Sequence, residues 1–445
     1  MKKIILSLFF LSLLQQPLKS QNLPNPVELT RPDIMGLQFY DALAKLRNLE
    51  PAYQPSSART SQEIAYFYYA LATIFSFNGM YDSAILAIDK TYLRGVLRQG
   101  KRTTVDTTNF SRYRTVSAKS YIVERSAYTQ AVMINEAHTV PRHRLFTKSL
   151  LQELYDKGYR VLCLEALAYS DEVSSPFYTG GGVGDYQEGK VQRLASGDRG
   201  YYTKESCFLD LLREANRIGY TIYGYEPEID SSARDSLMAV NISKIFKKNP
   251  KAKVVIHAGH GHIRAGVKYK NLYFHFKEMT GITPLTIDQA AYYGHPNEYY
   301  NSPYYTALCK HFNPTEPVIL TDSSGHHIHL SLDIDTTNVY IIAPYAGSAY
   351  GRSAWLFTQG GRKAVKVKNV SKPSIIKAYC ATEVNINTIN QPFYYRRSVP
   401  IDILSLENVN KGKDYYLALP DGVFLVRYED LKGNVYNEYY EQVTL

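Results

Sequence analysis

The sequence predicts an α/β protein with a mostly parallel sheet covered by helices on both faces, preceded by a small α-helical unit and followed by a small antiparallel β domain. Between residues 117 and 357, short apolar runs alternate with amphipathic segments of helical length, the pattern of βα units. At 445 residues the chain is long enough for several units. We expect a signal peptide at residues 1–20, the helical unit at 27–115, the α/β domain at 116–365 and the β-rich domain at 366–445.

The first 20 residues have the layout of a secretory signal peptide. Two lysines follow Met1, an apolar run covers residues 4–14, and a polar stretch begins near Ser20. The run is too short for a good membrane span, and no cysteine follows it closely to carry a lipid. The sequence therefore predicts an exported protein, either periplasmic or secreted.

Two amphipathic helices are expected to meet at Gly79. Apolar and aromatic side chains recur at helical spacing over residues 69–75 and 84–88, on either side of Gly79-Met-Tyr-Asp. This helix pair resembles a single tetratricopeptide repeat. Because a lone repeat cannot bury its own apolar face, we expect the unit to pack on the next domain.

The elements of the α/β domain follow from its apolar runs and helix signals. Strands are expected at residues 131–135, 160–164, 220–225 and 253–257, and helices at residues 141–157, 204–218 and 231–248. The connection over residues 169–203 is long for a compact domain, which predicts a lid or a disordered insertion. Its glycine cluster does not have the spacing of a dinucleotide-binding fingerprint.

From about Lys366 onward, the pattern changes to short strands. Turn signals occur at Pro420-Asp-Gly and Lys432-Gly-Asn, which predicts an antiparallel β module. It has no polar constellation of its own, so an accessory or partner-binding role is expected. An envelope protein, contacted through this unit or the helical one, is the candidate macromolecular partner.

The composition is that of a globular protein. Apolar residues make up 45% of the chain, charged residues 21%, and the net charge is +10. We interpret the basic run at residues 94–114 as a solvated face and expect no nucleic-acid partner, because no nucleic-acid-binding module accompanies it. The 40 tyrosines could stack on a sugar or a flat ligand, or serve surface packing. The sequence gives no oligomeric state.

Four of the predicted strands run directly into carboxylates or histidines. The first ends at Glu136 with His138 just beyond it, and the next two end at Glu165 and Glu226. The fourth leads into His257-Ala-Gly-His-Gly-His262. Because the carboxyl ends of parallel strands meet at one edge of a sheet, we expect these side chains to share one crevice.

These residue types suit acid–base chemistry. A histidine at a strand end can take a proton from water, and a neighbouring carboxylate can fix its tautomer. Arg234, in the first turn of the following helix, can clamp a carboxylate or stabilise developing negative charge, or it can form a salt bridge with Glu226 or Asp235. Asn135 is expected to hold a sharp exit turn after the first strand. The catalytic candidates are Glu136, His138, Glu165, Arg234, His260 and His262, and the substrate-binding candidates are His143, Tyr169, Glu226 and Glu228.

The order of these motifs resembles the erythromycin esterase and ChaN-like superfamily, which includes the TraB and TIKI proteins. The resemblance covers about residues 126–357. It rests on Asn135-Glu-Ala-His138, the strand closing on Glu165, Tyr225-Glu226, Arg234 with Met238-Ala239, Gly259-His-Gly-His262, Asp333-Ile-Asp335 and Gly351-Arg-Ser-Ala-Trp355.

The resemblance implies a different cofactor in each branch. The esterase branch implies no metal: His138 would be the general base, supported by Glu136 and Glu165, in a hydrolase of an ester-like or amide-like bond in a small molecule or peptide. The TIKI-like branch implies a divalent metal and two Gly-x-x-His motifs. Gly259-His-Gly-His262 has that form. In the first motif, Asn135-Glu-Ala-His138, asparagine stands in place of glycine. The ChaN-like branch implies haem. An envelope interaction protein with a vestigial site is the remaining alternative.

Overall fold

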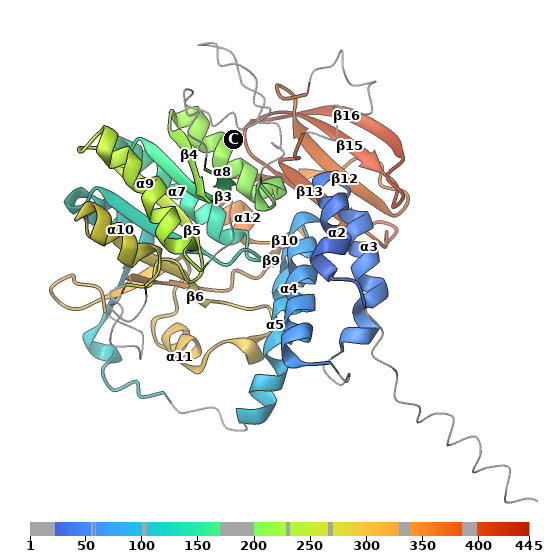
Figure 1. Cartoon of the computed structure of the whole chain (residues 1–445). Helices are drawn as coiled ribbons and strands as arrows, with labels where there is room; N and C mark the ends of the chain where they lie inside the picture. The colour runs from blue at the N-terminus through green and yellow to red at the C-terminus, as the bar shows by residue number, and fades with distance from the viewer. Residues whose placement is uncertain are drawn as a thin grey trace, which may run out of the picture.

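The computed structural model confirms the predicted fold class: a mixed α/β protein with a mostly parallel central sheet, a helical region before it and antiparallel sheets after it (Figure 1). It describes residues 23–54, 57, 59–99, 105–169, 200–227, 232–265, 270–328, 339–384 and 398–444, without the side chains of 92–99. The expected signal peptide and most of the 169–203 connection lie outside the described residues. Within the described part of the chain, no helix is both long and apolar enough to cross a membrane.

The described part of the helical region contains four α-helices, two more than the hairpin expected at Gly79. They are α2 (Pro26–Met35), α3 (Phe39–Leu49), α4 (Ser61–Phe77) and α5 (Tyr81–Gln99). Helix α4 begins with a capping box between Thr60 and Glu63. Gly79 has φ +70° between α4 and α5, and a Cβ there would fall 2.1 Å from the Ile403 carbonyl oxygen. This turn therefore packs directly on the β-rich domain and needs glycine.

Eight strands form the central sheet in the order β1-β7-β8-β6-β2-β5-β3-β4. Their bounds are β1 Arg114–Ser117, β2 Ala131–Glu136, β3 Val161–Ala168, β4 Thr221–Glu226, β5 Val254–Gly259, β6 Leu285–Tyr293, β7 Val318–Thr321 and β8 Val339–Ala343. The strands from β8 to β4 in this order are parallel, whereas β7 runs antiparallel to both β8 and β1. The carboxyl ends of β6, β2, β5, β3 and β4 therefore share one edge.

Helices cover both faces of this sheet. Helices α6 (Ala118–Arg125), α7 (Arg142–Asp156) and α8 (Ser206–Ile218) share a core with one face. Helices α9 (Arg234–Lys248), α10 (Leu272–Thr280) and α11 (Pro303–Phe312) bury their apolar sides on the other. Right-handed crossovers explain the split, because the chain moves outward from β2 through α7 and α8 and then returns through α9 and α10.

The C-terminal region forms small antiparallel sheets. Strands β13 (Asp402–Leu406), β12 (Ser374–Cys380), β15 (Gly422–Glu429) and β16 (Val435–Val443) form one sheet in that order, and β11 (Lys363–Lys366) pairs with β14 (Tyr416–Leu419). The predicted turn signals connect β14 to β15 and β15 to β16. The remaining short elements are η1 Glu50–Tyr53, η2 Phe110–Arg112, η3 Ser126–Tyr128, η4 Tyr202–Lys204, η5 Glu298–Tyr300, β9 Ser348–Ala349, β10 Arg352–Ser353 and α12 Trp355–Thr358.

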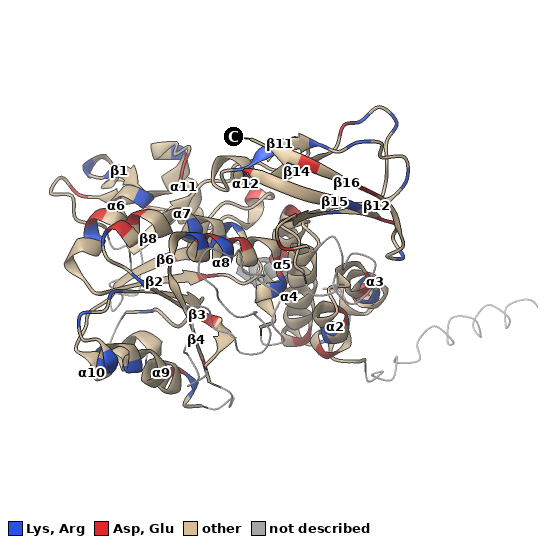
Figure 2. Ribbon diagram, turned by 90° about the horizontal axis from the view of Figure 1, so that it is seen from above, with Lys and Arg blue, Asp and Glu red and all other residues tan. Residues whose placement is uncertain are grey.

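The three regions pack on one another. One buried apolar cluster runs from α2–α5 through the α7 and α8 face of the sheet to β12 and β13. Buried ion pairs add to it: Arg362 lies 2.8 Å from Asp210 of α8, and Arg352 lies 2.8 Å from Asp402 of β13. Helices α4 and α5 lie between the central sheet and α2–α3 (Figure 2). The helical region therefore packs against the α/β domain, although it contains more helices than the hairpin expected from the sequence.

Candidate active site

Glu136 and His138 form a hydrogen-bonded pair at the carboxyl end of β2. Glu136 is the last residue of the strand, and its side chain is only 2% exposed. His138 stands two residues further on, is 21% exposed, and places Nδ1 2.7 Å from Glu136 Oε1. The strand thus carries the carboxylate into the interior while the histidine reaches solvent.

Arg144, on the first turn of α7, anchors the buried carboxylate from below. Its Nε and Nη2 donate to the two oxygens of Glu136 at 2.6 and 3.0 Å, and Nη1 donates to Glu205 Oε2 at 2.9 Å. Nη2 also donates to the His138 carbonyl oxygen at 2.9 Å. Glu205 in turn caps α8 by accepting from the first-turn backbone N–H groups. One fully buried guanidinium therefore fixes both the carboxylate and the backbone of the histidine.

The charges of this group define the tautomer of His138. Burial favours the neutral acid of Glu136, but the Arg144 cation and the hydrogen bond from His138 prevail and hold the pKa of Glu136 well below its usual range. An ionised carboxylate only accepts, so His138 Nδ1 must be the donor. Nε2 makes no hydrogen bond with any described residue, which leaves it as the proton acceptor of the ring.

Two tyrosines fix the plane of the His138 ring. Tyr202, in η4, stacks on it with ring centroids 4.2 Å apart and planes 18° from parallel. The Tyr202 hydroxyl lies 3.1 Å from the hydroxyl of Tyr69, which comes from α4 of the helical region. Burial raises the pKa of both phenols, so they stay neutral at ordinary pH. The helical region thus contributes to the support of this histidine.

A second charged cluster is centred on Arg234, the first residue of α9. Its guanidinium binds Glu226 with two hydrogen bonds of 2.6 and 2.8 Å and Glu165 Oε1 with one of 2.8 Å. His262 lies beside it, with Nε2 3.0 Å from Arg234 Nη1 and Nδ1 2.5 Å from Asp235 Oδ1. The salt bridge to Glu226 that the sequence left open is therefore present, and Arg234 links it to Glu165.

Carboxylates outnumber cations in this second cluster. Burial opposes charge on His262, but its contacts with Asp235 and Glu165 prevail and raise the pKa of His262 above its ordinary value. The nearby Arg234 cation opposes this protonation, but Glu165 and Glu226 bind that arginine and Asp235 binds His262 itself. Burial also disfavours the Glu165 anion, but its hydrogen bond with His262 and the nearby Arg234 cation hold the pKa of Glu165 well below its usual range.

The two clusters meet at Gly259, the last residue of β5. Its backbone N–H donates to Glu165 Oε2. A Cβ at this position would lie 3.0 Å from both Glu165 Oε2 and His138 Nε2. The bare α-carbon of Gly259 therefore lets one carboxylate oxygen and one imidazole nitrogen both pack close against the end of β5.

Two of the candidate histidines lie outside this network. Strand β5 ends before His260, whose side chain is exposed in a turn and forms no hydrogen bond with the described residues. His143 is buried, and its Nδ1 accepts from the Ala137 backbone N–H at 3.1 Å. Burial lowers the pKa of His143 to about 3, so this ring is neutral.

The other substrate-binding candidates are placed differently. Tyr169 follows β3 and packs against Tyr223 at 5.9 Å, with the Lys244 ammonium over its ring, on the side of the sheet that α9 covers. Glu226 is held by Arg234, and Glu228 lies outside the described residues. Asn135 does not form the expected exit turn. It lies within β2, without a positive φ, and its amide accepts from Gln289 N at 2.9 Å and donates to the His260 carbonyl oxygen.

Sequence reasoning missed several residues of the site. They are Arg144, Glu205, Tyr69 and Tyr202. Arg144 occupies the same helical face as Thr147, Leu151 and Leu154, all of which are buried, so a lone arginine on an apolar helix face was the available signal. The tyrosines carry no such signal because they meet only through tertiary packing.

No metal-binding arrangement stands out among these side chains. Over the described ranges, no group of three or more His, Cys, Asp or Glu residues is placed to hold a metal ion.

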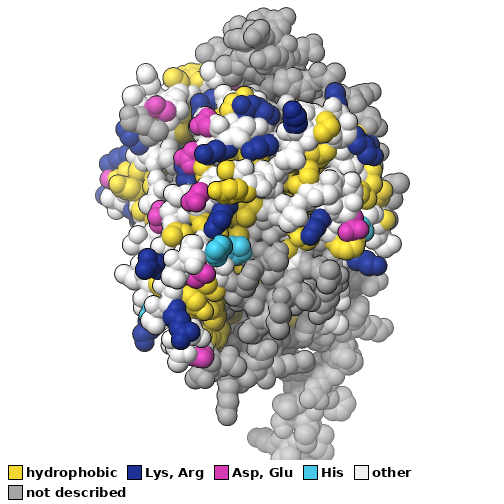
Figure 3. Space-filling view, turned by 90° about the vertical axis from the view of Figure 1, so that its left-hand side faces the viewer, with side chains coloured by type: hydrophobic (Ala, Val, Ile, Leu, Met, Phe, Trp, Pro, Cys, Tyr) yellow, Lys and Arg dark blue, Asp and Glu magenta, His cyan; other side chains and the backbone are white. Residues whose placement is uncertain are grey.

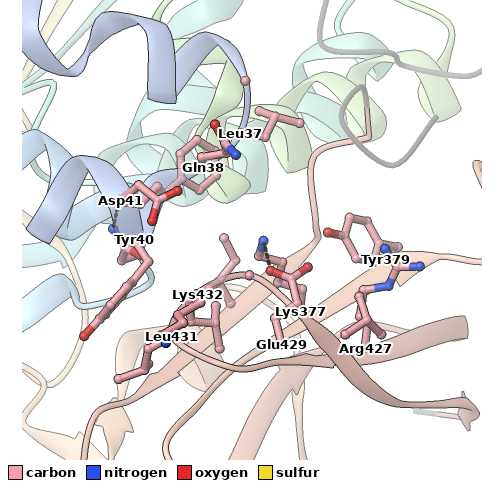
Figure 4. Close-up of a pocket in the computed structure, with 17 residues that line it drawn as sticks. Leu37, Gln38, Tyr40, Asp41, Lys377, Tyr379, Arg427, Glu429, Leu431 and Lys432 are labelled. Carbon is pink, nitrogen blue, oxygen red and sulfur yellow. Dashed lines mark hydrogen bonds and ion pairs between the residues drawn. The ribbon is translucent and has the colours of Figure 1, made fainter. Parts of the chain in front are cut away.

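On the face seen in Figure 3, Lys and Arg side chains are interspersed with Asp, Glu and uncharged residues. A cavity of about 330 Å³ lies elsewhere, between the α2–α3 turn and strands β12 and β15, where Lys377 and Glu429 form an ion pair of 2.7 Å (Figure 4). None of the candidate site residues lines it.

The fold and the site together define a class: an α/β protein with a histidine–carboxylate pair and a charged arginine cluster at the carboxyl edge of its parallel strands. No protein-family model and no curated protein matches the chain.

Proposed function

We propose that this protein is a hydrolase that cleaves an ester-like or amide-like bond in a small molecule or peptide, with His138 activating the attacking water. One observation carries the proposal. His138 donates through Nδ1 to a buried, ionised Glu136, while its Nε2 remains open beside Glu165 Oε2. This is the arrangement of a general base whose tautomer a carboxylate fixes.

The attacking water would lie beside Gly259, between His138 and Glu165. Water donates two hydrogen bonds, and His138 Nε2 and Glu165 Oε2 are two acceptors facing the same point. Glu165 would hold the water by one proton while His138 takes the other. The oxygen then attacks the carbonyl carbon of the substrate.

Arg234 supplies the positive charge of the site. Its side chain is 30% exposed, and Glu165 and Glu226 hold its guanidinium. An arginine fixed in this way can attract a substrate carboxylate or stabilise negative charge on the carbonyl oxygen. Glu226 then acts by positioning Arg234.

Export to the periplasm or the outside of the cell remains part of the proposal, on the strength of residues 1–20 alone. Two alternatives on the same fold are separated by direct measurement. Elemental analysis of the native protein that finds stoichiometric divalent metal favours the TIKI-like form, and a spectral shift on haem titration favours ligand binding. The esterase-like form predicts neither result.

The experiment is hydrolysis of a panel of p-nitrophenyl esters by the wild type, His138→Ala and His326→Ala. His326 is the matched control because its side chain is 71% exposed and lies away from the site. General base catalysis contributes about 10²- to 10⁴-fold, so His138→Ala should lose at least about 100-fold in kcat/KM. An unchanged rate in His138→Ala, with His326→Ala also unchanged, would refute the proposal.

A further inference from the structure

A second histidine–carboxylate pair lies on the same edge of the sheet. His295 stands two residues beyond the end of β6, as His138 stands two residues beyond the end of β2, and these strands are neighbours in the sheet. His295 Nδ1 lies 2.6 Å from Asp89 Oδ1. Asp89 belongs to α5, so the helical region provides the carboxylate of this pair.

The two pairs share three features. In each, Nδ1 bonds a carboxylate with a side chain no more than 2% exposed. In each, the imidazole stacks flat on a tyrosine: His295 lies 4.6 Å from Tyr293 at 16°, much as His138 lies on Tyr202. In each, Nε2 makes no hydrogen bond with the described residues. Both histidines are therefore held in plane with one nitrogen available.

The pairs differ in the charge around the carboxylate. Glu136 has a buried arginine as a second partner, whereas Asp89 forms an ion pair with His295 alone among the described residues. The other oxygen of Asp89 is buried without a hydrogen-bond partner. Burial without a second partner raises the pKa of the Asp89 carboxyl, so this carboxylate holds a proton more readily than Glu136 does. The first pair is suited to accept a proton and the second to supply one.

Two rings and one backbone hydrogen bond connect the two pairs. Tyr293 stacks on His295 and also meets the His143 ring edge-on at 5.3 Å. His143 accepts from the backbone of Ala137, which directly precedes His138. The buried His143 therefore sets the spacing between the pairs instead of contacting substrate.

We propose that His295, held by Asp89, is the proton donor to the leaving group in the hydrolysis proposed above, on which this inference rests. Water gives one proton to His138 Nε2, and its oxygen forms a bond to the carbonyl carbon. The bond from that carbon to the leaving oxygen or nitrogen breaks, its electron pair stays on the leaving atom, and His295 Nε2 gives that atom its proton. Release of a proton from His138 to solvent and uptake of one by His295 restore the starting state.

This assignment defines the orientation of the bound substrate along the sheet edge. The acyl group lies toward Arg234, and the leaving group lies on the β6 side, beneath α5. The helical region is then part of the catalytic apparatus through Asp89 and Tyr69.

The test compares two esters of one acid that differ in leaving group, p-nitrophenyl butyrate and ethyl butyrate. A nitrophenolate leaves without protonation, whereas an alkoxide needs a proton. His295→Gln should lose roughly 100-fold or more in kcat/KM on the ethyl ester and less than about 3-fold on the nitrophenyl ester. His138→Ala should lose activity on both, and the exposed control His326→Gln on neither.

A second variant keeps the test decisive if His295→Gln does not fold. Asp89→Asn retains the size and the acceptor oxygen and removes the charge, so it should show the same selective loss on the ethyl ester. Equal losses on the two esters in the folded variants would overturn the role of His295 and leave the His138 proposal standing. A wild type that hydrolyses neither ester would overturn both.

Discussion

Replacing Arg144 with methionine should destabilise the protein strongly. Arg144 is fully buried, and its four hydrogen bonds reach Glu136, Glu205 and the backbone of His138. Methionine fills a similar length but brings no charge, so two buried carboxylates lose their shared cation. Glu205 would keep its backbone donors from α8, whereas Glu136 would keep only the bond from His138.

The size of the loss follows from the charge left behind. Breaking a buried ion pair by removing one partner costs about 3–5 kcal/mol, because the other charge stays desolvated. We therefore expect Arg144→Met to lower the free energy of unfolding at pH 7 by about 3–5 kcal/mol. Arg217→Met is the matched control: Arg217 is 64% exposed in its pair with Glu214, and such surface pairs contribute less than about 1 kcal/mol.

The loss should also depend on pH. The lowered pKa of Glu136 in the folded wild type gives stability that is present above the carboxyl pKa of the unfolded chain and disappears as pH falls through the folded pKa. Without Arg144, burial instead raises the pKa of Glu136. As the pH falls, Glu136 is therefore protonated in the folded variant before it is protonated in the folded wild type, and the variant no longer carries an unpaired buried charge. The difference between wild type and variant should shrink from pH 7 to pH 4.

Urea unfolding followed by circular dichroism at pH 7 and pH 4 measures both effects. A loss below about 1 kcal/mol at pH 7 would show that Arg144 is not the main counterion of Glu136. A loss that is as large at pH 4 as at pH 7 would refute the electrostatic explanation and point to lost packing.

Two glycine substitutions give further predictions. Gly259→Ala should lower kcat on p-nitrophenyl esters by about 10-fold or more, with little change in the urea midpoint, because its Cβ would fall 3.0 Å from Glu165 and His138 and displace one of them. Full activity would contradict a catalytic role for these two side chains beside Gly259. Gly79→Ala should lower the free energy of unfolding by more than about 2 kcal/mol, because its Cβ would meet a β13 carbonyl at 2.1 Å. Gly281→Ala, at a similar φ of +71° in open space, should cost only about 1 kcal/mol; equal losses at the two positions would show that the helical turn is not packed as described.

The strands of the parallel sheet were predictable because their signals are local. Runs such as residues 131–135 and 253–257 are short, apolar and followed by polar groups, and the structure has β2 and β5 at these places. The order of the strands was not predictable in the same way. The insertion of β5 between β2 and β3 and the antiparallel pairing of β7 with β8 depend on contacts between distant segments.

The same distinction applies to the candidate site: residues with a local sequence signal were predictable, and residues placed by contacts between distant segments were not. Glu136, His138 and Glu165 were identified because each follows an apolar run. His260 was grouped with them, but the chain turns after Gly259 and exposes its side chain. Asp89 could not be identified, because it lies on a helix of another unit, far from His295 in sequence. A carboxylate that approaches a histidine through domain packing leaves no periodic pattern in the sequence.

A double-mutant cycle on Glu136 and His138 tests the water-activating pair most directly. kcat/KM for p-nitrophenyl butyrate is measured for Glu136→Gln, His138→Ala and the double variant, with circular dichroism to confirm folding. If Glu136 acts only through His138, the double variant should be no slower than His138→Ala, which itself loses at least about 100-fold. Losses that multiply in the double variant, or a His138→Ala variant with the wild-type rate, would contradict a water-activating pair at this sheet edge.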